Sequence, residues 1–87
     1  MAQVVYAAHA LGDVERAHQS ANAAAIQSAV QNLAAHPLVG RRVEEDMREL
    51  VISFGDTGYI ALYRFVVQQD TVRVLALRHQ REIGYLP

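Results

Sequence analysis

The sequence contains no cysteine, no tryptophan and no lysine. Without cysteine the chain can form neither disulfide bonds nor thiolate metal sites. Three of its histidines, His9, His18 and His36, are scattered and lack the spacing of metal ligands. We therefore expect no bound metal and no cofactor.

Long apolar runs are also absent. The longest are a few residues, whereas a membrane-spanning helix needs roughly 20. Residues 1–5 do not show a basic segment followed by a long apolar one, so no secretory signal is expected. We expect a cytoplasmic protein that does not associate with membranes. A length of 87 residues, with 52% hydrophobic and 20% charged, predicts one globular domain over residues 1–87.

The eight basic residues are all arginine, and the net charge of −1 argues against general affinity for nucleic acid. The distribution of arginine is uneven, since residues 71–81 hold Arg73, Arg78 and Arg81 beside His79, and no acid. The planar guanidinium group suits carboxylate and phosphate partners. Genome composition can account for the missing lysines but not for this local cluster.

The N-terminal half reads as one strand and two helices. Residues 3–8 begin with a β-branched and aromatic run, which is typical of a strand. We expect Asp13 to cap a short helix over residues 13–20, with Leu11 and Ala17 on its apolar side. Residues 22–35 are rich in alanine, carry an apolar stripe and end before Pro37, which predicts a second helix.

After an expected connector over residues 38–46, the periodicity changes to that of strands. Strands are predicted over residues 48–54, 59–67 and 71–77, with short turns between them. Short turns require an antiparallel meander. The predicted fold class is α+β, with an N-terminal strand and two helices packed on one face of a small antiparallel sheet.

Polar residues that suit catalysis or binding gather in residues 77–85. His79 could act as a general acid or base, Arg78 or Arg81 could neutralise a phosphate, and Tyr85 could stack on a base. The alternative is a solvated polar tail.

Two further places carry charge. In the run over residues 41–46, Glu44 could serve as a general base beside a phosphate clamp formed by Arg41 and Arg42. The alternative there is a solvated loop with local charge pairs, and such pairs contribute little. Arg64 interrupts an apolar strand, which favours an ion pair with an acid such as Glu49 over projection into a cleft.

Motif-like residues in a fixed order resemble the RelE/ParE toxin superfamily, and most closely its plasmid stabilisation proteins. They are His36-Pro37, Gly40-Arg41, Arg48-Glu49-Leu50, Gly58-Tyr59, Leu62-Tyr63-Arg64 and residues 78–85. The resemblance implies a β-strand, two helices and an antiparallel sheet. It also implies a cognate antitoxin that wraps the toxin in a hetero-oligomer.

The superfamily contains two activities. Its ribosome-dependent mRNA nucleases carry basic residues where this chain has Glu49, Val51 and Ile60, and an arginine where it has His79. A subset of these nucleases uses a glutamate, an arginine and a C-terminal histidine. Glu44 and His79 match the first and last, but the arginine position again falls on Ile60.

The resemblance to ParE-type toxins, at Leu62-Tyr63-Arg64 and His79-Gln80-Arg81, implies binding to DNA gyrase without a catalytic set. We favour this non-catalytic toxin, with Arg64, Arg78, His79 and Arg81 as target-binding residues. The runner-up is a metal-independent endoribonuclease that uses His79, Arg81 and Tyr85, with Glu44 as a further candidate. A lesser alternative is a degenerate homologue that is not toxic.

Overall fold

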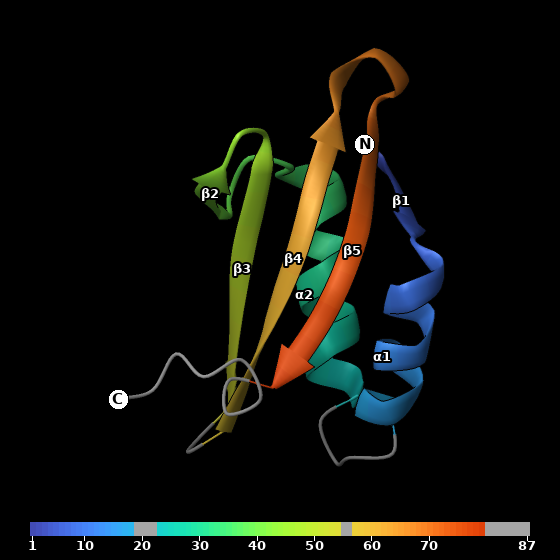
Figure 1. Ribbon diagram of the computed structural model, residues 1–87, viewed down its shortest axis with the longest axis vertical. Coiled ribbons are helices and arrows are strands. Elements are labelled where there is room, and N and C mark those ends of the chain that lie inside the picture. The colour runs from blue at the N-terminus through green and yellow to red at the C-terminus, as the bar shows by residue number, and fades with distance from the viewer. Residues whose placement is uncertain (19–22, 55–56, 80–87) are drawn as a thin grey trace.

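The computed structural model of the protein describes residues 1–18, 23–54 and 57–79. These residues form a five-stranded sheet with two helices against it (Figure 1). The elements in chain order are β1 (Gln3–Tyr6), α1 (Ala8–His18), α2 (Ala23–Ala35), β2 (Arg41–Glu44), β3 (Met47–Phe54), β4 (Thr57–Val66), the single 3-10 turn η1 (Val67–Gln69) and β5 (Thr71–His79).

The strand order is β1-β5-β4-β3-β2, with neighbours from β2 to β5 antiparallel and β1 parallel to β5. The predicted α+β class, N-terminal strand and antiparallel meander are thereby confirmed. The expected connector over residues 38–46 is wrong in part, because Arg41–Glu44 form β2 and pair with β3. All four residues of β2 are exposed, so this strand has no apolar alternation by which a sequence pattern could reveal it. Glu45 at φ 47° turns the chain into β3.

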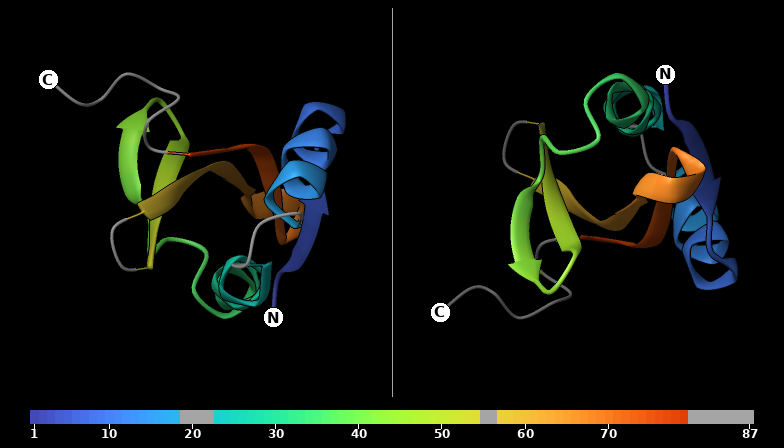
Figure 2. Two further views of the ribbon diagram at one scale, coloured as in Figure 1. Left: turned by 90° about the horizontal axis from the view of Figure 1, so that it is seen from below. Right: turned by 90° about the horizontal axis from the view of Figure 1, so that it is seen from above.

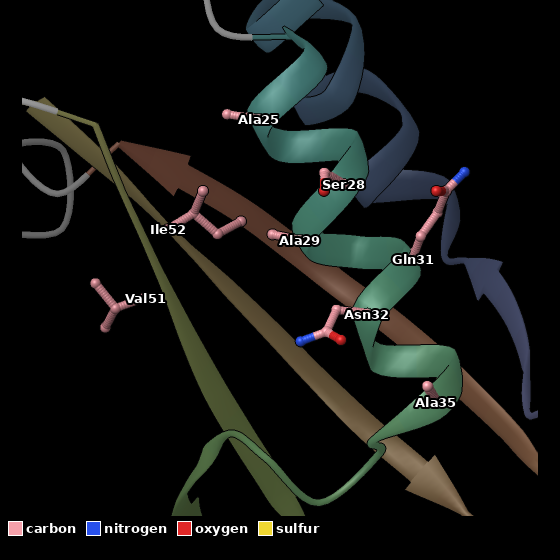
Figure 3. Close-up of a pocket in the computed structure, with 8 residues that line it drawn as sticks. All are labelled: Ala25, Ser28, Ala29, Gln31, Asn32, Ala35, Val51 and Ile52. Atoms are coloured by element: carbon pink, nitrogen blue, oxygen red, sulfur yellow. The ribbon is translucent and has the colours of Figure 1, made fainter.

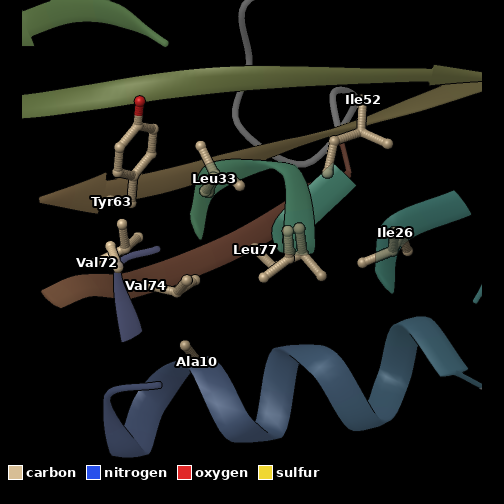
Figure 4. Packing of buried hydrophobic residues seen from close by; sticks show 11 residues of the cluster. Ala10, Ile26, Leu33, Ile52, Tyr63, Val72, Val74 and Leu77 are labelled. Atoms are coloured by element: carbon tan, nitrogen blue, oxygen red, sulfur yellow. The ribbon is translucent and has the colours of Figure 1, made fainter. Parts of the chain in front are cut away.

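Figure 2 shows α2 against one face of the sheet and α1 along the edge beside β5, and residues of both helices enter the same core. Alternate residues on the strands point to them, as the two-residue period of a strand requires. Ala61 and Tyr63 of β4 and Val72 and Val74 of β5 are almost fully buried there. Figure 4 shows Ala10 of α1, Leu33 of α2, Tyr63, Val72 and Val74 meeting in one cluster.

Helix α2 matches its sequence prediction to within one residue, and its apolar stripe of Ile26, Val30 and Leu33 is buried. The prediction for α1 is wrong in two respects. The helix begins at Ala8, so Asp13 lies inside it rather than at its cap. Leu11 is 53% exposed, whereas Ala10 and Asp13 are buried. A buried side made of a small residue and a charged one gives no hydrophobic signal.

Candidate functional site: the helix-free face of the sheet

The face of the sheet opposite the helices carries the side chains that alternate with the core residues. On β4 these are Ile60, Leu62 and Arg64. The strand register places Val51 and Arg78 beside Ile60, Glu49 and Ala76 beside Leu62, and Met47 and Arg73 beside Arg64. We call this set, together with Arg41 and Val5 at its two edges, the helix-free face.

The middle of the helix-free face is apolar. Val51 is 53% exposed, and Ile60 and Ala76 are buried beside Leu62. Val51 and Ile60 occupy adjacent strands in direct register, at the positions where the resemblance puts basic residues in mRNA nucleases. The two substitutions are therefore neighbours, and they place uncharged side chains, exposed at Val51 and buried at Ile60, where those nucleases carry charge.

Two of the arginines of this face, Arg41 and Arg64, form ion pairs with acids of the β2–β3 hairpin. Nη2 of Arg41 lies 3.0 Å from Oε1 of Glu49, and Nε of Arg64 lies 2.9 Å from Oδ1 of Asp46. The predicted ion pair at Arg64 is confirmed, but its partner is not Glu49, because β2 brings Arg41 to Glu49 instead. Arg73 and Arg78 are exposed, and neither forms an ion pair within the part of the chain that the structure describes.

Aromatic rings lie on the other side of the sheet. Tyr6, Tyr59, Tyr63 and Phe65 all pack in or against the helix-covered core. Among the side chains described in residues 1–18, 23–54 and 57–79, the helix-free face thus presents no ring on which a nucleic-acid base could stack.

The predicted site residues are placed as follows. Arg64 and Arg78 share the helix-free face. The backbone of His79 pairs with Tyr59 at the end of β5, while its side chain, Arg81 and Tyr85 lie outside what the structure describes.

Glu44 and His79 are not brought together. Glu44 pairs with Met47 of β3. His79 pairs with Tyr59 of β4, and Tyr59 in turn pairs with Ile52 of β3. Met47 and Ile52 are five positions apart on one strand, or about 16 Å.

Sequence reasoning missed the residue that holds the last part of β5. Strand β1 ends at Tyr6, opposite Val74, so the next residues of β5 have no strand on that side. Helix α1 lies there instead (Figure 1), and Oδ2 of Asp13 accepts a hydrogen bond from the N–H of Leu77 at 3.0 Å. Leu77 directly precedes Arg78 and His79. No local pattern could reveal a contact between residues so far apart in the chain.

A second group holds the connection into β2. The N–H of Gly40 donates to the buried hydroxyl of Tyr63 at 2.8 Å, and Nη1 of Arg48 donates to the carbonyl oxygens of Leu38 and Gly40. Burial raises the pKa of Tyr63, while the Gly40 N–H and the charge of Arg48 lower it by less. A Cβ atom on Gly40 would lie 2.6 Å from the Tyr63 hydroxyl, so only glycine fits.

A groove of about 650 Å³ runs between α2 and β3 (Figure 3). Small and polar residues of the helix line one wall, including Ala25, Ser28 and Asn32, and Val51 and Ile52 line the other. Within the described ranges, no three potential metal ligands lie together. No helix in those ranges is long and apolar enough to cross a membrane.

Comparison with known proteins gives one family and several relatives. The family described as the ParE toxin of the type II toxin–antitoxin system parDE matches residues 4–84. Toxin RelE3 of Caulobacter vibrioides is 44% identical over 57 residues, which is 66% of this chain and only 60% of that protein.

Solved structures that share the fold include two toxin–antitoxin complexes. One is the intact Escherichia coli RelBE toxin–antitoxin complex, with a TM-score of 0.74 and 12% identity over 90% of this chain and 95% of that chain. The other is the RelBE2 complex of Mycobacterium tuberculosis, with a TM-score of 0.67 and 25% identity over 91% of this chain and 98% of that chain.

Proposed function

Because this chain belongs to the family of ParE toxins of type II toxin–antitoxin systems, we propose that it is the toxin of such a pair. In this proposal it stops growth by binding DNA gyrase, and a cognate antitoxin neutralises it. A gyrase-binding protein would act in the cytoplasm.

The observation that favours a binding toxin over a nuclease is the apolar middle of the helix-free face. A nuclease without a metal must activate the RNA 2′-hydroxyl, neutralise a phosphate and protonate a leaving oxygen, and losing one such group costs a factor of about 10² to 10⁴ in rate. Val51 and Ile60 supply none of these functions. A protein target, in contrast, is bound by an apolar centre with a charged rim.

The rim residues have distinct roles in the proposal. Arg78 lies beside Ile60 and is exposed, which suits a contact at the edge of the apolar centre. Arg64 lies at the other end of the face, where its pair with Asp46 holds one side of the guanidinium group. His79 and Arg81 continue the chain from Arg78 and complete the proposed target-binding set.

An endoribonuclease is the second candidate, because the relative with 44% identity is named as a RelE toxin. That activity would rest on His79, Arg81 and Tyr85. Glu44 is a poor addition to this set, since its row lies about 16 Å from that of His79 along the sheet. A homologue that keeps the fold without toxicity is the third candidate.

The antitoxin is proposed from the family and from the surface. Both solved relatives described above are toxin–antitoxin complexes. The groove between α2 and β3 is open, and β1 and β2 are edge strands, which present unpaired backbone groups to an added strand. We therefore propose a toxin–antitoxin hetero-oligomer.

The deciding experiment expresses the chain alone in bacteria and assays gyrase-dependent DNA breaks and ribosome-dependent mRNA cleavage in the same cells. We expect growth arrest with DNA breaks and without cleavage. Arg78→Ala should weaken both arrest and breaks, while Gln27→Ala, at an exposed position on α2, should leave them unchanged. Cleavage of mRNA without DNA breaks would establish the nuclease instead. Normal growth with folded protein would favour the non-toxic homologue.

A further inference from the structure

One row of the helix-free face places two arginines directly opposite each other. Across the sheet, from β2 to β1, the register partners are Glu44, Met47, Arg64, Arg73 and Val5. Directly opposite residues on antiparallel strands have Cβ atoms about 5 Å apart. Arg64 and Arg73 therefore extend from adjacent strands on the same side of the sheet.

Two like charges in this position disfavour the folded state unless an anion lies near them. Asp46 meets Nε of Arg64 from the hairpin side, and this contact is largely solvent-exposed, with the Asp46 side chain 62% accessible. Arg73, on the far side of Arg64 from the hairpin, is exposed and has no ion pair within the described part of the chain. Asp46 thus contacts Arg64 and not Arg73, and Glu44, the acid within the row, is separated from both arginines by Met47.

The surroundings of the pair distinguish a carboxylate from a phosphate of nucleic acid. Met47 and Val5 border the two arginines, and Val5 is 40% exposed. No described side chain on this face offers an aromatic ring for stacking, which is the usual companion of phosphate contacts in single-stranded RNA recognition. An arginine fork bordered by aliphatic side chains suits an Asp or Glu of a protein segment that also carries apolar residues.

We propose that Arg64 and Arg73 form a carboxylate-binding subsite that takes an acidic side chain of the protein target. The subsite extends the proposed function, since it names the chemistry by which one end of the helix-free face holds that target. Arg78 lies four positions from Arg64 along the β4 ladder, through its partner Ile60, or about 13 Å away. A target segment with acids at both ends and apolar residues between them matches this spacing.

The subsite is tested first without gyrase. The chain, labelled with ¹⁵N and made by cell-free translation to avoid toxicity, is titrated with an acetylated Glu-Val-Glu-Val-Glu peptide, with the same peptide carrying Gln for Glu, and with an oligouridine. We expect the Nε–H signals of Arg64 and Arg73 to shift with the acidic peptide alone, and less so at high salt. The shift at Arg64 should shrink in Arg73→Gln and persist in Gln27→Ala, a substitution at an exposed position on α2.

A stronger response to the oligouridine than to the acidic peptide would overturn the proposal and assign the pair to phosphate. The absence of any shift would also overturn it.

A second measurement uses purified gyrase. Arg73→Gln should raise the Kd by about 10-fold, the effect of losing one charge-assisted hydrogen bond, whereas Gln27→Ala should not change it. Gyrase binding that is unaffected by Arg73→Gln would refute the subsite and leave the proposed function standing. Peptide binding as expected, with no gyrase binding at all, would refute the proposed function and retain the subsite.

Discussion

The carboxylate of Asp13 accepts a hydrogen bond from the backbone N–H of Leu77 at 3.0 Å, across a separation of 64 residues. Asp13 is only 4% exposed although it is ionisable, and Nε2 of the exposed His9, one turn earlier on α1, lies 3.7 Å from the same oxygen. Asp13 thus supplies a hydrogen-bond acceptor to the part of β5 that has no pairing with β1. It thereby ties α1 to the segment that leads into Arg78 and His79.

Removing this acid should destabilise the fold. Asp13→Ala leaves the buried N–H of Leu77 without its acceptor, which costs about 1–3 kcal/mol of unfolding free energy. Asp13→Asn keeps an acceptor oxygen and should cost less. Denaturant unfolding measures both, with Glu15→Ala, at an exposed position on the same helix, as the control. Equal stability of Asp13→Ala and the control would show that the hydrogen bond contributes nothing.

Gly40→Ala should destabilise the protein by about 1–3 kcal/mol, the usual cost of forcing an extra carbon into a filled site. The added Cβ would lie 2.6 Å from the Tyr63 hydroxyl and 2.7 Å from the Glu49 carbonyl oxygen, and the latter belongs to a strand that cannot easily move. Thermal unfolding measures the effect. Val39→Ala is the control, because this neighbour is 53% exposed and should change stability little. A melting temperature of Gly40→Ala at or above that of the control would contradict the prediction.

Stability should fall in strongly alkaline solution. Burial raises the pKa of both Tyr6 and Tyr63 above the ordinary value of 10.0. The unfolded chain therefore loses these phenolic protons first, so their contribution is complete below pH 10 and is lost as the pH rises through the higher folded values. Unfolding free energy measured across this range should decline less steeply in Tyr63→Phe than in the parent. Equal slopes would mean that Tyr63 titrates normally.

An acid placed in the apolar middle of the helix-free face should block the target without unfolding the chain. Val51 is 53% exposed, so Val51→Asp buries no charge in the free protein, yet it would bury one in a complex. We expect loss of growth arrest and of gyrase binding at an unchanged melting temperature. Leu38→Asp, at a position 59% exposed in the loop before β2, is the control and should remain toxic. Full toxicity of Val51→Asp would place the contact elsewhere.

The two proposed activities give different outcomes for His79→Ala. For a binding surface, losing one peripheral side chain costs about 1 kcal/mol, so toxicity should weaken and return when expression is raised. For a nuclease, loss of a proton-transfer group should abolish toxicity at every expression level while ribosome binding persists. We expect the graded result, measured as growth against inducer concentration. Loss of mRNA cleavage with retained ribosome binding would overturn it.

Elements whose pattern repeats locally could be predicted from the sequence. Helix α2 and strands β3, β4 and β5 were located to within two residues, because burial against one face imposes a period of 3.6 or 2 on their apolar residues. The same alternation already placed Arg64 on a face with Ile60 and Leu62. The absence of cysteine excluded disulfides without any structure.

Other features depended on contacts between distant segments, and only the tertiary structure decided them. Strand β2 forms because residues 41–44 pair with β3. As a result Glu49 forms its ion pair with Arg41, and Asp46 forms the ion pair with Arg64. The burial of Asp13 follows from the end of β1 at Tyr6, and the opposition of Arg64 and Arg73 follows from the register between β4 and β5. Backbone pairing satisfies hydrogen bonds whatever the side chains are. The sequence of one segment therefore does not tell which residues of another segment it will face.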